Sequence, residues 1–183
     1  MRVIAGIGGL LAAALSLGLS IYETRTAAEV KEIAADATVN AGQWDVTVHS
    51  GRLAAETPDG RAVRAGDKAL TVDLTLDNLT AESSNLYRET LKLENVSGAP
   101  APQFYLLRDR DLLSDLQPMM PEKIAAVWVL PASQPLPEVL KVAIVGTTYK
   151  AQDNLYAASG WFNPQTVARV ELPLASAAKG AAP

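Results

Sequence analysis

The sequence predicts a mainly β protein, a β-sandwich preceded by one N-terminal transmembrane helix. Two observations lead to this prediction. One uncharged apolar run, residues 3–22, has the length of a membrane span. Beyond Gly42, short segments of alternating apolar and polar residues recur between turns rich in Gly and Pro, as in a sandwich. The expected parts are an anchor (1–22), a helical stalk and linker (23–42), the sandwich (43–174) and a flexible tail (175–183).

The apolar run at residues 3–22 forms the expected anchor. Twenty helical residues reach about 30 Å, the thickness of the hydrocarbon core of a bilayer. A cleaved signal peptide is the alternative, but the run is longer than the usual apolar region of about 7 to 15 residues. Arg2 precedes the run, so we expect a single-pass plasma-membrane protein with a cytoplasmic N-terminus and an extracytoplasmic C-terminal domain.

Small residues form two rows along this expected helix. Such rows let helix backbones approach closely in lipid, which is how membrane helices associate. Two interpretations remain open, a packing face against other membrane subunits or a span that is simply rich in Gly and Ala. The candidate helix-packing residues are Ala5, Gly8, Gly9, Ala12, Ala13, Ser16 and Ser20.

Helical spacing continues after the anchor. Apolar residues recur every three or four positions through residues 23–37, with charged residues on the other faces. The sequence Asn40-Ala41-Gly42 then supplies residues that tolerate the left-handed conformation found at helix ends. We therefore expect a helical stalk over residues 23–37.

From residue 43 onward the period changes to that of strands. The clearest predicted strand covers 70–76, where Leu70, Val72, Leu74 and Leu76 alternate with polar residues. The segments 124–130 and 139–145 are almost uninterruptedly apolar, which favours the centre of a sheet. The other predicted strands are 44–48, 90–96, 103–107 and 166–172, and a turn is predicted at 57–60.

Three of these stretches resemble a known family. They are 44–48 (WDVTV), 70–78 (LTVDLTLDN), and 116–118 (LQP) with 127–131 (VWVLP). They resemble the immunoglobulin-like extracytoplasmic domains of bacterial lipoproteins and membrane-anchored proteins known as DUF4352, or telokin-like. Over residues 43–174 the resemblance implies an immunoglobulin-like β-sandwich that binds or scaffolds rather than catalyses. The lipoprotein members carry a lipid-modified Cys; this chain has no Cys, so its anchoring must rest on residues 3–22.

The composition offers little for catalysis or metal binding. With no Cys and one His, the chain has no Cys nucleophile and no set of zinc ligands. His49 is expected at the surface, on the polar side of its strand, and the charged cluster at 108–111 is expected to be a solvated, self-paired loop. The net charge of −4 shows no basic field, so nucleic acid is not an expected partner. We predict no enzyme activity and no cofactor.

Apolar residues in expected loops are the remaining candidates. Exposed apolar loops mark contact surfaces unless they fold back to cap the core, and both interpretations remain open. The candidate contact residues are Met119, Met120, Tyr156, Trp161 and Phe162.

Two functions are compatible with these expectations. The first is an accessory or scaffold subunit of a larger membrane complex, with integral membrane protein subunits and membrane lipid as partners. The second is a tethered binding module for a cell-envelope lipid, glycan or small ligand.

Overall fold

The computed structural model describes residues 30–153, 155 and 157–175. The chain divides into two compact units, Met1–Lys31 and Glu32–Pro183, and only two residues of the first unit are described. The predicted anchor, its helix-packing residues and the tail beyond residue 175 lie outside the described residues. Within the described part, no helix has the length and apolar character that crossing a membrane requires.

The described elements are strands and one short 3-10 helix, η1. In chain order they are β1 (Lys31–Ile33), β2 (Thr38–Asn40), β3 (Trp44–Ala54), β4 (Asp67–Asn78), η1 (Leu86–Glu89), β5 (Leu91–Leu93), β6 (Gln103–Leu106), β7 (Asp111–Leu112), β8 (Glu122–Pro131), β9 (Val139–Lys150) and β10 (Gly160–Ala175).

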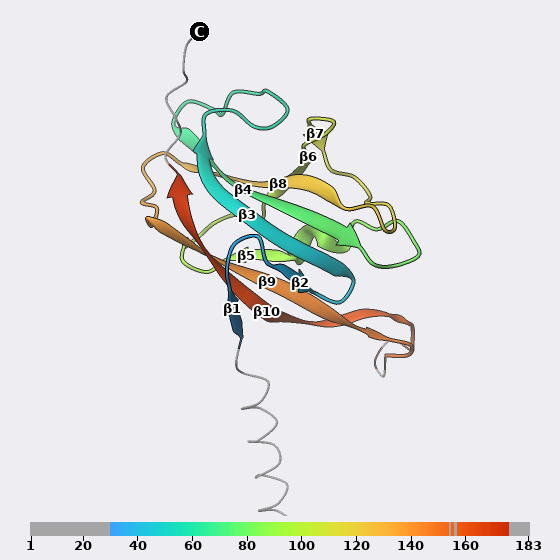
Figure 1. Ribbon diagram of the computed structural model, residues 1–183. Helices are drawn as coiled ribbons and strands as arrows, with labels where there is room; N and C mark the ends of the chain where they lie inside the picture. The colour runs from blue at the N-terminus through green and yellow to red at the C-terminus, as the bar shows by residue number, and fades with distance from the viewer. Residues whose placement is uncertain (1–29, 154, 156, 176–183) are drawn as a thin grey trace, which may run out of the picture. The chain divides into compact units, whose positions relative to one another are not determined.

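The strands form two layers that are joined at one edge (Figure 1). The strand order is β5-β9-β10-β3-β4-β8-β6-β7, with β1 beside β10 and β2 beside β3. The β10 strand lies in one layer along β9, and its last residues, Leu174 and Ala175, pair in parallel with Gly51 and Arg52 of β3 in the other layer. One hydrogen-bonded sheet thus folds over into a sandwich.

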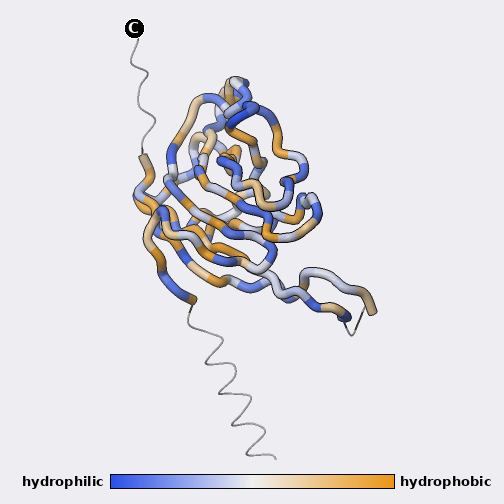
Figure 2. Tube along the Cα trace, turned by 45° about the vertical axis from the view of Figure 1, so that its right-hand side comes forward, coloured by the Kyte–Doolittle hydropathy of each residue, from blue (hydrophilic) through white to orange (hydrophobic). Residues whose placement is uncertain are grey.

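The core lies between these two layers. Apolar and polar residues are interleaved along the chain (Figure 2), and along β3 and much of β4 buried side chains alternate with more exposed ones, whereas β8 is buried almost throughout. On β4 the inward residues Leu70, Val72, Leu74 and Leu76 are almost completely buried, as the alternation predicts. Burying one such side chain contributes about 1.5–3 kcal/mol. The alternation of β4 is therefore a direct cause of the sandwich.

The predicted helical stalk is wrong over its described residues. Residues 31–33 and 38–40 form strands β1 and β2, and Asp36 between them has a φ of 66° that no α-helix accepts. Val39 pairs with Val46 of β3, and the Asp36 N–H donates to the Val48 carbonyl over 2.8 Å. Strand pairing with β3 outweighs the local helical spacing, because propensity is a weak preference that tertiary contacts override. The sheet therefore begins before residue 43.

The other predicted strands lie where strands are observed, but their lengths differ from the observed ones. Each of the seven predicted strands overlaps an observed one, but β3 continues to Ala54 and β10 spans Gly160–Ala175. Trp161 and Phe162 therefore lie in a strand and not in the loop that the sequence predicted. Predicted residues 90–96 contain only the three-residue strand β5. The β9–β10 hairpin is thus much longer than the alternation alone indicates.

Candidate functional site

Two adjoining cavities lie beside η1 and β5. Their volumes are about 610 and 630 Å³, and both are lined by Arg88, Glu89, Val145 and Pro164. The first extends toward Trp161 and the second along β5. We call this continuous depression the edge groove. Each of its two parts is larger than the cavities of about 330 and 220 Å³ beside the segment 108–117 and beside Phe104.

Tyr87 sets the first wall of the edge groove. It is buried, its hydroxyl donates to the Leu113 carbonyl over 2.8 Å, and its ring packs edge-on against Phe104 with centroids 5.2 Å apart. Because Tyr87 points inward from the short helix η1, its neighbours point outward: Leu86 is 61 % exposed, and Arg88 is also exposed. Burial of Tyr87 thus orients its neighbours Leu86 and Arg88 toward the groove.

The β9–β10 hairpin forms the second wall. Trp161 pairs with Tyr149 across the hairpin, and their rings pack edge-on with centroids 5.4 Å apart. Gly42, at a φ of 86°, lets the backbone between β2 and β3 approach this wall. A Cβ on Gly42 would lie 1.9 Å from the Thr147 carbonyl oxygen and 3.1 Å from the Trp161 ring. The position of Trp161 therefore depends on a glycine.

The predicted contact residues do not form one surface. Trp161 lines the edge groove, whereas Met120 lines a separate cavity of about 330 Å³ beside the charged segment 108–111. Met119 is 68 % exposed, and the Phe162 ring lies 5.6 Å from the Lys150 ammonium. Tyr156 lies outside the described residues. Of the four candidates that the structure describes, only Trp161 lines the edge groove.

Sequence reasoning missed most of this site. Leu86, Arg88 and Glu89 lie on η1, which interrupts the run of predicted strands, and Val145 was assigned to a buried strand centre. The polar run Ser83-Ser84-Asn85 before η1 is a signal for a turn or helix start that could have indicated it. Nothing in the sequence shows that η1 faces the hairpin, since that placement arises from the fold.

His49 lies at a surface position, as predicted, and has two polar partners. Its Nδ1 is 2.6 Å from Asp36 Oδ1, and its Nε2 is 2.8 Å from Thr75 Oγ1. A hydroxyl, an imidazole and a carboxylate in this order resemble the arrangement of nucleophilic catalysis. Within the described residues, none of the three lines the edge groove or the 330 Å³ cavity. The contacts of His49 with Asp36 and Thr75 instead connect the β1–β2 turn to β3 and β4.

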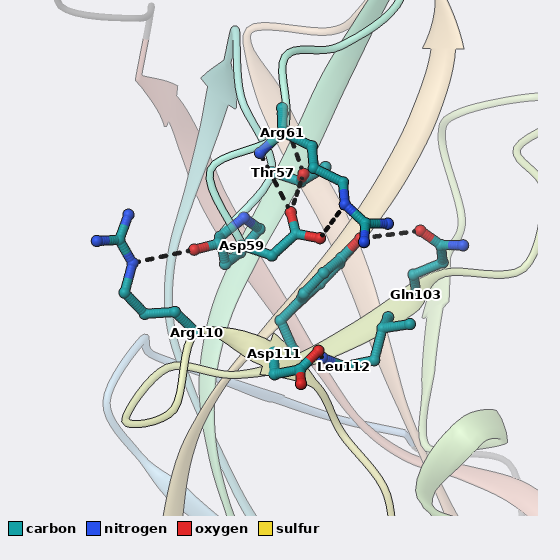
Figure 3. A network of polar contacts seen from close by, with 9 residues as sticks. Thr57, Asp59, Arg61, Gln103, Arg110, Asp111 and Leu112 are labelled. Carbon is teal, nitrogen blue, oxygen red and sulfur yellow. Dashed lines mark hydrogen bonds and ion pairs between the residues drawn. The ribbon is translucent and has the colours of Figure 1, made fainter.

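A loop closes the outer face of the β4–β8–β6 part of the sheet. There Tyr105 packs with Ala69, Ala125 and Val127 in a second apolar cluster. Asp59 lies between Thr57 and Arg61 in the loop over this cluster, and Arg110 donates to the loop at the Pro58 carbonyl (Figure 3). This network covers apolar surface.

Two ionisable groups respond to this network. The Thr57 hydroxyl donates to the Asp59 carboxylate and lowers the pKa of Asp59, and Arg61, 3.2 Å away, adds to the effect. Burial raises the pKa of Tyr105, and the negative charge of Asp59 adds to it. Asp59 is therefore held ionised as part of the loop structure.

The charged cluster at 108–111 is the densest group of acidic and basic side chains in the sequence. The cluster at 108–111 is exposed and self-paired as predicted, with Arg108 2.9 Å from Asp109 and 2.7 Å from Glu122. Across the described residues, no group of three or more His, Asp or Glu side chains is placed to hold a metal ion.

Comparison with known proteins supports the fold alone. No protein-family model and no curated protein matches the sequence. Among solved structures, an uncharacterized beta-sandwich protein from Clostridium difficile 630 is similar, with a TM-score of 0.52 and 9 % identity, covering 79 % of this chain and 94 % of that chain. The fold is a β-sandwich. The finer resemblance to DUF4352 has no matching family behind it.

Proposed function

We propose that this protein is a non-catalytic accessory or scaffold subunit of a larger membrane complex and that it binds a protein partner at the edge groove. The observation that carries the proposal is the groove itself, two cavities that share Arg88, Glu89, Val145 and Pro164 in their lining. A groove of this size at the edge of a sandwich provides a concave surface to which a partner can add contacts.

The side chains around the edge groove suit a protein partner. Leu86 and Tyr149 are 61 % and 54 % exposed, and Trp161 is half-buried beside them. Arg88 and Glu89 supply charges of both signs. Protein interfaces are enriched in aromatic residues and Arg, with polar groups at the rim.

The membrane location in this proposal rests on the sequence. The expected anchor at 3–22 would place the sandwich on the extracytoplasmic face, and its rows of small residues would pack against integral membrane subunits. The resemblance to the immunoglobulin-like DUF4352 domains implies the same setting. The second contact site would then be the edge groove, outside the bilayer.

The test is co-purification of the full chain from its own cells in mild detergent. The variant Leu86→Asp, with Trp161→Ala, places a charge in the groove and removes its aromatic wall. The control Leu112→Asp makes the same change at another exposed leucine, which is 53 % exposed on β7. We expect a stoichiometric protein partner with the wild type and the control, and loss of it with the groove variant. A chain that runs as a lone monomer, or equal binding by all three, contradicts the proposal.

One observation favours a second candidate, a tethered module for a glycan. Around Trp161 the edge groove also presents Gln43, Asn85 and Arg88, so an aromatic face lies with amide and guanidinium groups. Such groups can stack on a sugar ring and bond to its hydroxyls. Titration with cell-envelope glycan fragments, followed by Trp fluorescence, tests this candidate. Saturable quenching that Trp161→Ala removes would support it.

A further inference from the structure

The strand β5 is the edge of its layer, and its pairing with β9 shows which of its backbone groups are used. The Thr90 carbonyl accepts from the Val145 N–H over 2.8 Å, and the Glu94 N–H donates to the Lys141 carbonyl over 2.9 Å. Lys92 is paired with Ala143 in the same register. Since hydrogen-bonding direction alternates along an antiparallel strand, Thr90, Lys92 and Glu94 face β9.

By the same alternation, the N–H and C=O groups of Leu91 and Leu93 face away from β9. β5 pairs with β9 alone, and within the described residues no further backbone hydrogen bond reaches either leucine. Both leucines line the edge groove. Four backbone groups thus point from the strand edge toward a space that a ligand can enter.

The segment after β5 is a poor partner for these groups. Pro100 and Pro102 line the same part of the edge groove as Leu91 and Leu93, and a proline has no N–H to donate. The free edge of β5 therefore stays unpaired although chain from the same domain lies nearby.

The β7 edge, at the other end of the strand order, is protected differently. β7 has only two residues, and the outward N–H of Leu112 donates to Asp111 Oδ1 over 2.7 Å. A short strand with its donor already bonded cannot extend a sheet, which is a usual protection of edges. β5 lacks this protection of its outward donors.

We infer that β5 accepts an extended segment of a protein partner as an added antiparallel strand. This rests on the proposed function and names the partner's chemistry. Backbone groups of the segment pair with Leu91 and Leu93, and the binding mode is the known one in which main-chain bonds give affinity and alternate side chains give specificity.

Lys92 selects the partner. Its side chain is exposed at the centre of β5. Two copies of β5 paired antiparallel about their centres would place Lys92 opposite Lys92, and like charges directly opposite each other destabilise a strand pair. An acidic residue opposite Lys92 is favourable instead. The expected segment is therefore from a different chain and carries Asp or Glu between two apolar residues.

The probe is a blocked heptapeptide, Ser-Thr-Val-Glu-Val-Thr-Ser, added to the full chain in detergent micelles. Its two valines lie opposite Leu93 and Leu91, and its glutamate lies opposite Lys92. Amide hydrogen exchange by NMR is the readout. We expect weak binding, with Kd of the order of 1 mM. With about 5 mM peptide, the Leu91 and Leu93 amides should exchange about four- to sixfold more slowly, because exchange through the free form falls by the factor 1 + [peptide]/Kd, whereas the Lys92 amide, already paired with β9, should not change.

Matched peptides and variants sharpen this result. N-methylation of both valines removes the donors that face β5 and should weaken binding at least tenfold, whereas N-methylation of the glutamate should leave binding unchanged. The variant Lys92→Glu should prefer a peptide with lysine in place of the glutamate by about two- to fivefold. The control Lys123→Glu, an exposed lysine on β8, should keep the original preference.

Three outcomes overturn strand addition. The first is an unchanged exchange rate of the Leu91 and Leu93 amides at about 5 mM peptide, several times the expected Kd. The second is an equal loss of affinity when the valines or the glutamate of the peptide are N-methylated. The third is slower amide exchange at β7 instead of at β5. The co-purification above judges the accessory-subunit proposal separately, because a partner that needs Leu86 and Trp161 can bind without pairing to β5.

Discussion

The layer formed by β5, β9 and β10 has two very different sides. On the β10 side, Leu174 and Ala175 pair with Gly51 and Arg52 of the other layer, and β1 also pairs with β10. On the β5 side, the layer ends beside the edge groove with the outward groups of Leu91 and Leu93 unpaired within the described residues. One side is closed by backbone hydrogen bonds, and the other is open.

Packing follows the same division. On the closed side the packing is tight, because a Cβ on Gly51 would lie 2.8 Å from Leu140 Cδ1 and force it to shift, and Leu172 beside it is 1 % exposed. On the open side Leu86 is 61 % exposed. The difference teaches that the closed side stabilises the fold, whereas the open side is free to bind a partner.

A matched pair of leucines gives the largest expected difference. Leu172→Ala removes buried methyl groups and leaves a cavity, which should lower the free energy of unfolding by about 2–5 kcal/mol. Leu86→Ala removes an exposed side chain and should change it by less than about 0.5 kcal/mol. Urea unfolding of both variants measures this. Similar losses for both would show that the open side is part of the core after all.

Gly42 tests whether the open side also depends on backbone geometry. In Gly42→Ala the left-handed φ costs about 1 kcal/mol, and the clash with the Thr147 carbonyl adds to this cost. We therefore expect the free energy of unfolding to fall by about 2 kcal/mol or more. The Trp161 fluorescence should shift as the wall of the edge groove moves.

Gly60→Ala is the control for this change. Gly60 also has a positive φ, 81°, but a Cβ there would meet nothing within 4 Å. The free energy of unfolding of Gly60→Ala should therefore fall by about 1 kcal/mol, from the backbone conformation alone. The Trp161 fluorescence should not change. Equal losses of unfolding free energy in Gly42→Ala and Gly60→Ala would show that the Thr147 carbonyl moves aside without an energetic penalty.

The core could be predicted from the sequence to a large extent, whereas neither side of the β5–β9–β10 layer could. The alternation of Leu70, Val72, Leu74 and Leu76 reports directly which face is buried, because a strand has period two. A sequence shows no such period for an edge, since which strand ends a layer depends on pairing between distant segments. The three-residue β5 is set by its contact with β9, not by its own residues.

Local spacing also misled at the start of the domain. Ile33, Ala34 and Ala37 recur as on a helix, yet the β1–β2 turn is held by Asp36 through its bond with His49 and by the pairing of Val39 with Val46. Those partners lie seven and thirteen residues away along the chain. Similarly, Thr75 and Asp36 became partners of His49 only through the fold, so no sequence motif marked them.

The smallest expected effect concerns a third region, the outer face that a loop closes rather than strands. Thr57→Val removes the hydroxyl that donates to the Asp59 carboxylate, so the pKa of Asp59 should rise toward its usual value. An NMR titration of the Asp59 carboxyl measures this. Overall stability should change little, because the network is at the surface.

The sign of the pH effect follows from the lowered pKa. A carboxyl whose folded pKa lies below its unfolded value stabilises the protein above the unfolded pKa, and this stabilisation is lost as the pH falls through the folded pKa. Thr57→Val should therefore reduce the loss of loop order on acidification, seen as a smaller change in amide exchange at Arg61. Ser50→Ala, which removes a hydroxyl bonded to Asp73, is the control and should leave Asp59 unchanged. An unchanged Asp59 titration in Thr57→Val would assign the lowered pKa to Arg61, and the loop would then be held by charge instead of by the hydroxyl.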